Sequence, residues 1–263
     1  MDNPTIVFTR TSIGTVLMLV LVLIVDKNII KIRIADVPVV IGISLSGSII
    51  LMIFYNIAVV ELTLSLAAVL LSLSPVFVLI VSALVFKEKI TAKKVICMAG
   101  AIIGCAMLTG VFEMSVSSMK LSSLGILAGI GSTVCNGLYI IFSRVATDRG
   151  CGTMTTCFYS FVFATIMLLP FVDWETFLIF IMDDPAGSAV FLIVQAICTS
   201  ILPTITYMLA LKYIETGRAA ILEGGSEPAA AMVMGIILYS EVPTLIGAIG
   251  MIITIIALAV LSS

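Results

Sequence analysis

Apolar runs without any charged residue alternate with short charged connections along almost the whole chain. Most of these runs approach the length of about 20 residues that an α-helix needs to cross the hydrocarbon core of a bilayer. One further run of similar length carries two acids. The pattern predicts an all-α transmembrane protein with nine membrane spans, at residues 11–25, 37–60, 62–86, 95–112, 121–143, 150–172, 185–211, 219–240 and 242–263.

The acid-bearing run, 219–240, places Glu223 and Glu227 four residues apart, so a helix presents both on one face about one turn from each other. Gly224 and Gly225 lie between them, and Pro228 follows directly. Because the proline ring clashes with the carbonyl of Gly224, we expect a kinked or loosened helix here. A charge near the bilayer centre costs roughly 2.5–3.5 kcal/mol on insertion scales. The two acids therefore predict a polar cavity.

These two carboxylates are candidates for binding a proton or a cation, because two carboxylates this close in a low dielectric cannot both ionise cheaply. A structural role stays open as the alternative. In that case Glu223 or Glu227 pairs with a base, or bonds the backbone groups that Pro228 frees.

Arg10 is a third charged candidate, roughly 8 Å from the middle of its span at a rise of about 1.5 Å per residue. It can bind a substrate carboxylate, neutralise Glu227, or extend to the outer lipid headgroups. Six uncharged polar residues within spans can line a cavity or bond a neighbouring helix: Tyr55, Asn56, Asn136, Tyr139, Gln195 and Tyr207.

The charged connections predict the orientation of the chain. Eleven of the 13 Lys and Arg residues fall in alternate connections: Lys27, Lys31, Arg33, Lys87, Lys89, Lys93, Lys94, Arg144, Arg149, Lys212 and Arg218. The other connections are acidic and hold one base, Lys120. The positive-inside rule places the basic side in the cytoplasm, so we expect a multi-pass protein of the plasma (inner) membrane with its N-terminus outside and its C-terminus inside. Trp174 and the stretch 176–182 predict an interfacial segment on the outer face.

The chain also repeats itself. Seven residues reappear in the same order with one slip: Tyr55, Ala58, Ala67, Ala68, Pro75, Glu88 and Thr91 match Tyr207, Ala210, Ala219, Ala220, Pro228, Glu241 and Thr244. Glu88 is expected in the cytoplasm and Glu241 outside, so the two copies are predicted to be inverted. Inverted repeats are common in secondary transporters. We expect repeats at 1–115 and 116–263.

Two motifs resemble the EamA-type permeases of the drug/metabolite transporter superfamily. Pro75 and Phe77 precede the stretch 86–89 (Phe-Lys-Glu-Lys), and the pair Glu227–Pro228 precedes 239–241 (Tyr-Ser-Glu). The resemblance implies ten helices in two inverted halves of five, with a central cavity lined by the first four helices of each half. The opening from Pro4 to Arg10 resembles that family's second helix. The first repeat is therefore expected to supply helices 2–5, giving four plus five spans without the first helix.

The composition supports this class, because 61% of the 263 residues are hydrophobic and 11% are charged, whereas a soluble domain needs more polar surface. The chain has no histidine, which excludes a Ser-His-Asp triad and histidine ligation of zinc or haem. The six cysteines form no CxxC pair and are expected to pack as small apolar groups. A net charge of −2 predicts no nucleic-acid partner. We expect no catalytic residue, no metal and no cofactor.

The leading hypothesis is a secondary transporter that moves a small metabolite by alternating access, with proton coupling left open. An amino acid, an amine or a drug-like solute would fit the family. The alternative is a truncated, non-transporting remnant or a regulatory membrane protein. An intramembrane enzyme is disfavoured by the absence of histidine and of a GxGD motif. The expected partners are the bilayer and a small-molecule substrate, and a homodimer is left open.

Two further patterns predict structural roles. The pairs Gly100–Gly104 and Gly125–Gly129 have the spacing that lets membrane helices approach closely. Glu88 and Glu241 each stand where a connection enters the next helix. They are expected to bond the open N–H groups of that helix.

Cysteine labelling tests the orientation. Single cysteines near Glu61, Glu113 and Asp184 should react with an impermeant reagent added outside cells. Those near Lys31, Lys93 and Arg149 should react with it only after the cells are permeabilised. The reverse pattern would show that both the orientation and the inverted repeat are wrong.

Overall fold

The computed structural model describes residues 3–25, 32–113, 122–239 and 244–262, and every element in these ranges is helical. The predicted all-α class is therefore confirmed. Within these ranges, seven stretches are long and apolar enough to cross a membrane: Pro4–Leu21, Ile34–Glu61, Leu64–Val85, Ser123–Asp148, Thr153–Phe171, Pro185–Ala210 and Leu245–Ser262. Two expected spans fall outside this set, α6 (Ala92–Leu108, 17 residues) and the acid-bearing α12 (Thr216–Tyr239). The number nine stays a prediction.

The chain forms two compact units, one of residues 1–52 and 142–213 and the other of 53–141 and 214–263. Each unit combines residues from both predicted repeats. Two of the three boundaries between the units fall within continuous helices, α3 (Leu51–Glu61) and α7 (Ser123–Asp148), and the third lies in a connection, between Tyr213 and Ile214.

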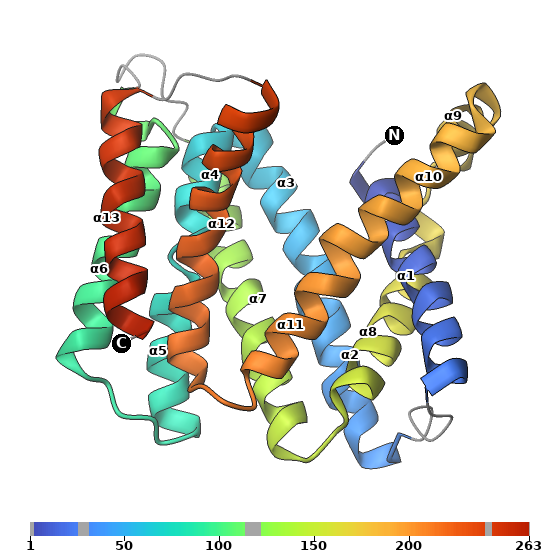
Figure 1. Cartoon of the computed structure of the whole chain (residues 1–263), viewed down its shortest axis with the longest axis horizontal. Helices are drawn as coiled ribbons and strands as arrows, with labels where there is room; N and C mark the ends of the chain where they lie inside the picture. The colour runs from blue at the N-terminus through green and yellow to red at the C-terminus, as the bar shows by residue number, and fades with distance from the viewer. Residues whose placement is uncertain (1–2, 26–31, 114–121, 240–243, 263) are drawn as a thin grey trace. The chain divides into compact units, whose positions relative to one another are not determined.

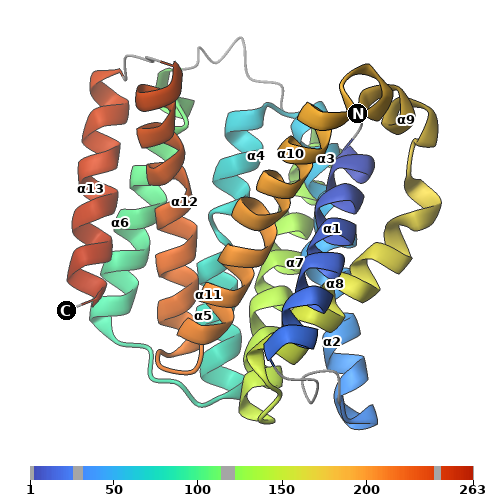
Figure 2. The same cartoon turned by 45° about the vertical axis from the view of Figure 1, so that its right-hand side comes forward.

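The first unit is built around α1, which packs against α8 and α10, while α2 also packs against α8 (Figure 2). Its apolar core includes Val7, Phe8, Ile49, Leu168 and Val172. The elements of this unit are α1 (Asn3–Val25), η2 (Ile34–Asp36), α2 (Val37–Ser44), η3 (Leu45–Ile50), α8 (Thr153–Leu168), η6 (Leu169–Phe171), α9 (Trp174–Asp183), α10 (Pro185–Ala196), η7 (Ile197–Ile201) and α11 (Leu202–Ala210).

Two expected spans contain a wider, π-helical turn, η3 after α2 and η7 after α10. Hydroxyl side chains bond the backbone carbonyls at these turns. Ser46 Oγ donates to the Gly42 carbonyl (2.6 Å), and Thr199 Oγ1 donates to the Gln195 carbonyl (2.8 Å). Such bonds compete with the regular helical pattern and are available inside a membrane protein where water is not. At each interruption a hydroxyl group thus bonds one backbone carbonyl.

The stretch around Trp174, expected at the membrane interface, forms the short helix α9. Asp173 Oδ1 caps it by accepting a hydrogen bond from the Thr176 backbone N–H (3.2 Å), as expected for an aspartate at a helix start. The Trp174 ring meets Phe8 of α1 edge to face, with 5.7 Å between the ring centroids. The depth of this helix in a bilayer stays a prediction.

The second unit contains α12, which packs against α5, α6 and α13, and α6 also lies along α13 (Figure 1). The elements of this unit are most of α3, α4 (Leu64–Leu71), α5 (Ser74–Val85), α6 (Ala92–Leu108), η4 (Val111–Glu113), most of α7, α12 (Thr216–Tyr239) and α13 (Leu245–Ser262).

Glycines set the closest helix contacts of this unit, as predicted. A Cβ atom on Gly104 of α6 would overlap Thr254 Oγ1 and lie 2.7 Å from the Gly250 carbonyl of α13. Gly125 and Gly129 of α7 similarly face leucine side chains of the same unit. Close backbone approach of this kind replaces the hydrophobic effect as a source of helix association in lipid.

Replacing Gly104 by alanine should therefore push α6 and α13 apart, at a cost of about 1–3 kcal/mol. We expect a lower midpoint of thermal unfolding for the purified protein in detergent. Gly14→Ala is the matched control, since its new Cβ would meet its nearest neighbour, Phe161, at 3.6 Å, an ordinary contact distance. If Gly104→Ala unfolds at or above the wild-type temperature, the close contact is not a determinant of stability.

Candidate functional site

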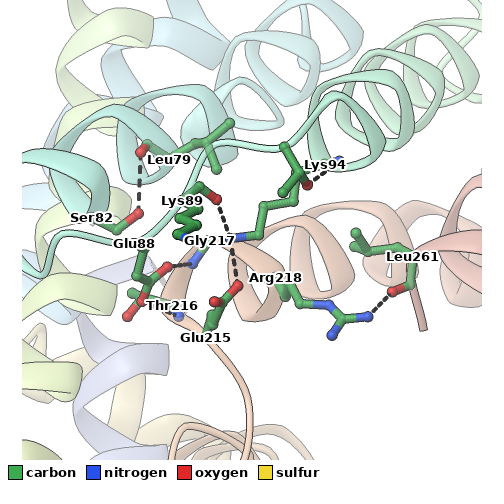
Figure 3. Close-up of polar contacts among 11 residues, drawn as sticks. Leu79, Ser82, Glu88, Lys89, Lys94, Glu215, Thr216, Gly217, Arg218 and Leu261 are labelled. Carbon is green, nitrogen blue, oxygen red and sulfur yellow. Dashed lines mark hydrogen bonds and ion pairs between the residues drawn. The ribbon is translucent and has the colours of Figure 1, made fainter. Parts of the chain in front are cut away.

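The N-terminus of α12 is capped by a carboxylate from the connection between α5 and α6 (Figure 3). Glu88 Oε1 accepts a hydrogen bond from the Thr216 backbone N–H (2.7 Å), and Oε2 accepts one from the Gly217 backbone N–H (3.1 Å). The first N–H groups of a helix have no partner within the helix and carry a partial positive charge. A carboxylate therefore fits this position in both hydrogen bonding and charge.

The local backbone brings Glu88 to this position. Lys87 has a positive φ of 56°, which is uncommon for a side-chain-bearing residue and reverses the chain after α5. The backbone N–H of Glu88 then donates a hydrogen bond to the Ser82 carbonyl of α5 (3.3 Å). Gly217 allows the close approach, since a Cβ there would lie 2.9 Å from the Leu79 side chain.

Two cations also hold the start of α12 (Figure 3). Lys94 Nζ of α6, which is buried, pairs with Glu215 Oε2 (2.5 Å) and donates to the Lys89 carbonyl (2.9 Å). Arg218 donates to the Leu261 carbonyl near the end of α13, where the helix dipole favours a positive charge. The first turn of α12 is thus tied to α6, to α13 and to the connection that follows α5.

The charged state of Glu88 is favoured by its surroundings. Partial burial alone would raise the pKa of the carboxyl, but the hydrogen bonds from Gly217 and Thr216, together with the charge of Lys94, lower the pKa below its ordinary value. The cap is therefore ionised at neutral pH.

The sequence prediction for Glu88 was right about the type of contact and wrong about the helix. Glu88 bonds α12, whereas Thr91 Oγ1 caps α6 by accepting a hydrogen bond from the Lys94 N–H (3.3 Å). Glu241, for which the same role was expected, lies outside the described residues.

Beyond its first turn, α12 continues without interruption through Pro228. The loosening that Pro228 and the two glycines predicted therefore does not interrupt the helix, and a kink stays a prediction. The two glycines provide close contacts instead. A Cβ on Gly224 would lie 3.1 Å from the Pro75 ring of α5, and one on Gly225 would lie 2.9 Å from Leu258 of α13.

The backbone is interrupted in the facing wall, between α4 and α5. The sequence had predicted one continuous span at 62–86. Pro75, in the first turn of α5, cannot donate a backbone hydrogen bond. The carbonyls before the break are bonded by hydroxyls: Thr133 Oγ1 of α7 donates to Leu70 (2.6 Å), and Ser72 Oγ donates to Val69 (2.7 Å).

A cavity of about 510 Å³ lies against this interruption and the acid-bearing face of α12. Of the predicted site residues, Tyr55, Asn136, Glu223 and Glu227 line it together. The described residues that line it are Tyr55, Ala68, Leu71, Ser72, Ser74, Leu108, Thr109, Gly110, Asn136, Glu223, Gly224, Glu227, Pro228, Met232, Ile236, Thr244 and Gly247. The cavity extends along α12 over about 20 Å, at a rise of about 1.5 Å per residue.

The other predicted site residues are not part of this cavity. Asn56 and Tyr139 belong to the same unit but do not line it. Arg10, Gln195 and Tyr207 belong to the first unit. Their role in binding stays a prediction.

Arg10 keeps a feature of a functional residue. Its Nε is buried and has no hydrogen-bond partner among the residues that the structure describes. A buried polar atom without a partner is costly within a span, which is compatible with a role of Arg10 in binding that stays a prediction.

Among the lining residues that had not been predicted, four carry a hydroxyl group, namely Ser72, Ser74, Thr109 and Thr244. Asn136 Nδ2 donates to Ser74 Oγ (3.0 Å), which joins α7 to the first turn of α5. The signal for the two serines was present as Ser-Leu-Ser-Pro, hydroxyls directly before a proline. Hydroxyl residues next to a proline can re-satisfy the backbone groups that it frees.

Seven membrane-length helical stretches within the described ranges identify a multi-pass membrane protein. The chain belongs to the EamA-like transporter family, whose model matches residues 1–110 and 123–263. The resemblance noted from the motifs is thereby confirmed.

Two uncharacterized transporters from Archaeoglobus fulgidus are similar to this chain. One is 29% identical over 142 residues, which cover 54% of this chain and 49% of that protein. The other is 27% identical over 197 residues, which cover 74% of this chain and 66% of that protein. The chain thus aligns with about half to two thirds of the length of these relatives. The chain also superposes on a protein of known crystal structure with a TM-score of 0.78 and 15% sequence identity. The match covers 99% of this chain and 87% of the other chain, which shows a shared fold.

Removing the cap of α12 should destabilise the protein. We expect Glu88→Ala to cost about 0.5–2 kcal/mol, as for other helix caps, and Glu88→Gln to cost less because one acceptor oxygen remains. The contribution of Glu88 is present above the ordinary carboxyl pKa and is lost as the pH falls through its lowered folded-state pKa. Thermal unfolding in detergent between pH 3 and 7 measures both effects.

Lys89→Ala is the control for Glu88→Ala, because it removes an exposed neighbouring side chain and keeps the backbone carbonyl that Lys94 bonds. Equal unfolding temperatures for the two variants at pH 7 would argue against a capping role.

Proposed function

We propose that the protein is a secondary transporter that moves a small metabolite across the membrane by alternating access. The observation that carries this proposal is the cavity in which Glu223 and Glu227 lie opposite the break between α4 and α5. Acids within a membrane protein and irregular backbone at membrane depth are each typical of solute pathways. Family membership favours transport over an enzymatic activity.

The positions of the π-helical turns support the inverted repeat. Tyr207 follows Tyr55 by 152 residues (207 − 55), and η7, from Ile197, follows η3, from Leu45, by the same interval (197 − 45). A matching irregularity at the same register is stronger support than shared apolar residues, since π turns are rare. We therefore propose two inverted repeats, 1–115 and 116–263.

In this proposal α6 and α12 also cross the bilayer, which makes nine spans of a ten-helix carrier fold. The protein lies in the plasma membrane in this proposal, with its basic connections on the cytoplasmic side. The Glu88 cap therefore also lies on the cytoplasmic side. The cavity extends from the middle of α12 toward its opposite, outer end.

Proton coupling is part of the proposal and rests on the two carboxylates. A carboxyl in the cavity can take up a proton as solute leaves and release it as solute binds, which links the two fluxes.

The test uses the full chain in liposomes, with a solute identified by comparing metabolites inside and outside cells with and without expression. We expect Glu223→Gln to abolish uptake driven by a pH gradient while leaving solute exchange largely intact. Glutamine keeps the size of the side chain but cannot carry the proton. Unchanged pH-driven uptake would reduce Glu223 to a structural role.

Glu175→Gln is the control for this substitution, because it removes an acid from the exposed first turn of α9. The alternative, a non-transporting remnant or regulatory protein, predicts no counterflow of any labelled solute by wild-type protein. Counterflow by the wild-type chain therefore decides between the two functions.

A further inference from the structure

The break between α4 and α5 gathers several oxygen atoms within one turn of the chain. In a continuous helix the Leu71 carbonyl would accept a hydrogen bond from residue 75, but Pro75 has no N–H to donate. Ser72 and Ser74 stand on either side of the residue that separates the two helices. Leu71, Ser72 and Ser74 all line the cavity. The break thus supplies this wall with a backbone carbonyl and two hydroxyl groups.

The neighbouring helix α7 adds an amide group to the same place. Asn136 lines the cavity, and its Nδ2 donates a hydrogen bond to Ser74 Oγ (3.0 Å). The next residue, Gly137, lets α7 approach α5 closely, since a Cβ there would overlap the Phe77 ring. Because Oδ1 of Asn136 shares a carbon atom with Nδ2, this amide oxygen is also held close to the break.

These groups can act as electron-pair donors to a cation together with the bonds that they already make. Carbonyl, amide and hydroxyl oxygens each have two lone pairs. Ser72 directs its hydrogen to the Val69 carbonyl (2.7 Å), which leaves its lone pairs for another partner. Ser74 Oγ accepts one hydrogen bond from Asn136 and keeps a second lone pair.

The helix ends at the break favour a cation over an anion. The last carbonyls of α4 carry the partial negative charge of a helix C-terminus. The start of α5 offers few donors in return, because Pro75 lacks an N–H and the Val76 N–H donates to the Leu73 carbonyl (2.9 Å). The backbone at the break therefore presents acceptors.

Neutral oxygens of this kind suit a monovalent alkali cation. Rings of backbone carbonyls replace the hydration shell of K⁺ in channels, and unwound carbonyls at the C-terminal ends of half-helices coordinate Na⁺ in transporters. Ca²⁺ and Mg²⁺ are instead held with the help of carboxylates. Glu223 stands beside the break, since a Cβ on Gly224 would lie 3.1 Å from the Pro75 ring. The neutral oxygens define the site whatever the ionisation or the partner of Glu223.

We propose that the break between α4 and α5 binds a monovalent alkali cation, whose ligands include the Leu71 carbonyl, the Ser72 and Ser74 hydroxyls and the Asn136 amide oxygen. The site lies in the cavity on which the proposed function rests, but binding of the ion does not require transport. In the proposed transporter such an ion couples the movement of solute to a cation gradient.

The test measures ion binding to the purified full chain in detergent. Radioactive sodium and rubidium, the latter in place of potassium, are used as probes, and choline chloride keeps the ionic strength constant. We expect saturable binding of at least one of the two ions. Unlabelled Na⁺ or K⁺ should displace the bound ion, whereas choline should not, because it is too large for a site made by one turn of the chain.

Variants locate the binding at the break. Ser74→Ala and Asn136→Leu should each weaken binding by about tenfold or more, as is typical when a metal site loses one of its groups. Ser132→Ala is the matched control. It removes a buried hydroxyl from α7 one turn before Asn136, where Ser132 Oγ bonds the Gly129 carbonyl (2.7 Å) outside the described lining of the cavity.

Asn136→Asp separates a ligand from a structural residue. Aspartate keeps the size and an oxygen of asparagine but cannot donate the hydrogen bond to Ser74. We expect binding as tight as in the wild type or tighter. A loss equal to that of Asn136→Leu would overturn the assignment of the Asn136 oxygen as a ligand.

The absence of saturable binding of both ions to the wild-type chain overturns the proposal, even if the variants fail to fold. Binding that Ser74→Ala and Asn136→Leu leave unchanged also overturns it. Counterflow in liposomes separates these outcomes from failure of the proposed function. Counterflow of a solute without ion binding keeps the transporter and excludes the ion site. Ion binding that the variants weaken, without counterflow of any solute, keeps the ion site and excludes the transporter.

Discussion

The contact of Glu88 with the first two N–H groups of α12 is the interaction on which the geometry of the candidate site depends. It fixes the end of a helix whose two acids lie about 10 and 16 Å further along its axis, at a rise of about 1.5 Å per residue. The Lys94–Glu215 pair and the Arg218–Leu261 bond hold the same end against α6 and α13. Each partner fills hydrogen-bonding capacity that a helix terminus leaves open. The acids are therefore held in place from a position outside the cavity.

The requirement that backbone polar groups be satisfied explains where the irregular segments occur. The end of α4 has its carbonyls bonded by Thr133 and Ser72, and the π turns have theirs bonded by Ser46 and Thr199. In lipid an unsatisfied group costs several kcal/mol, so such segments persist where a hydroxyl can reach them. The break before α5 lies next to the cavity. Because hydroxyl groups bond the backbone carbonyls there, the helical wall of the cavity can be irregular at this point.

Local patterns made much of the fold predictable from the sequence. The apolar runs marked the helices, and the four-residue spacing of Glu223 and Glu227 placed both acids along one cavity. The partner of Glu88 could not be predicted, because it is 128 residues away in the sequence and Thr91 offered a nearer cap for α6. The break between α4 and α5 was missed because the length of the apolar run was given more weight than Pro75, which stands within that run and cannot donate a helical hydrogen bond. Four of the nine predicted site residues line the cavity, because polarity alone does not show which face of a helix a side chain occupies.

The π turn η7 also affects how this protein tolerates changes in length. A π turn holds one residue more than an α-helical turn, so it absorbs an insertion while the flanking helices keep their orientation. If the same residues were wound as a regular α-helix, α11 would be turned by about 100° around its axis, and Met208, now 1% exposed, would leave the core of the first unit. Deletion of one residue within Ile197–Ile201 would restore regular winding and leave Met208 in place, whereas a deletion a few residues later would not. Segments in the middle of a membrane span are usually the least tolerant of insertions and deletions. This segment is an exception, because its π turn already holds one extra residue.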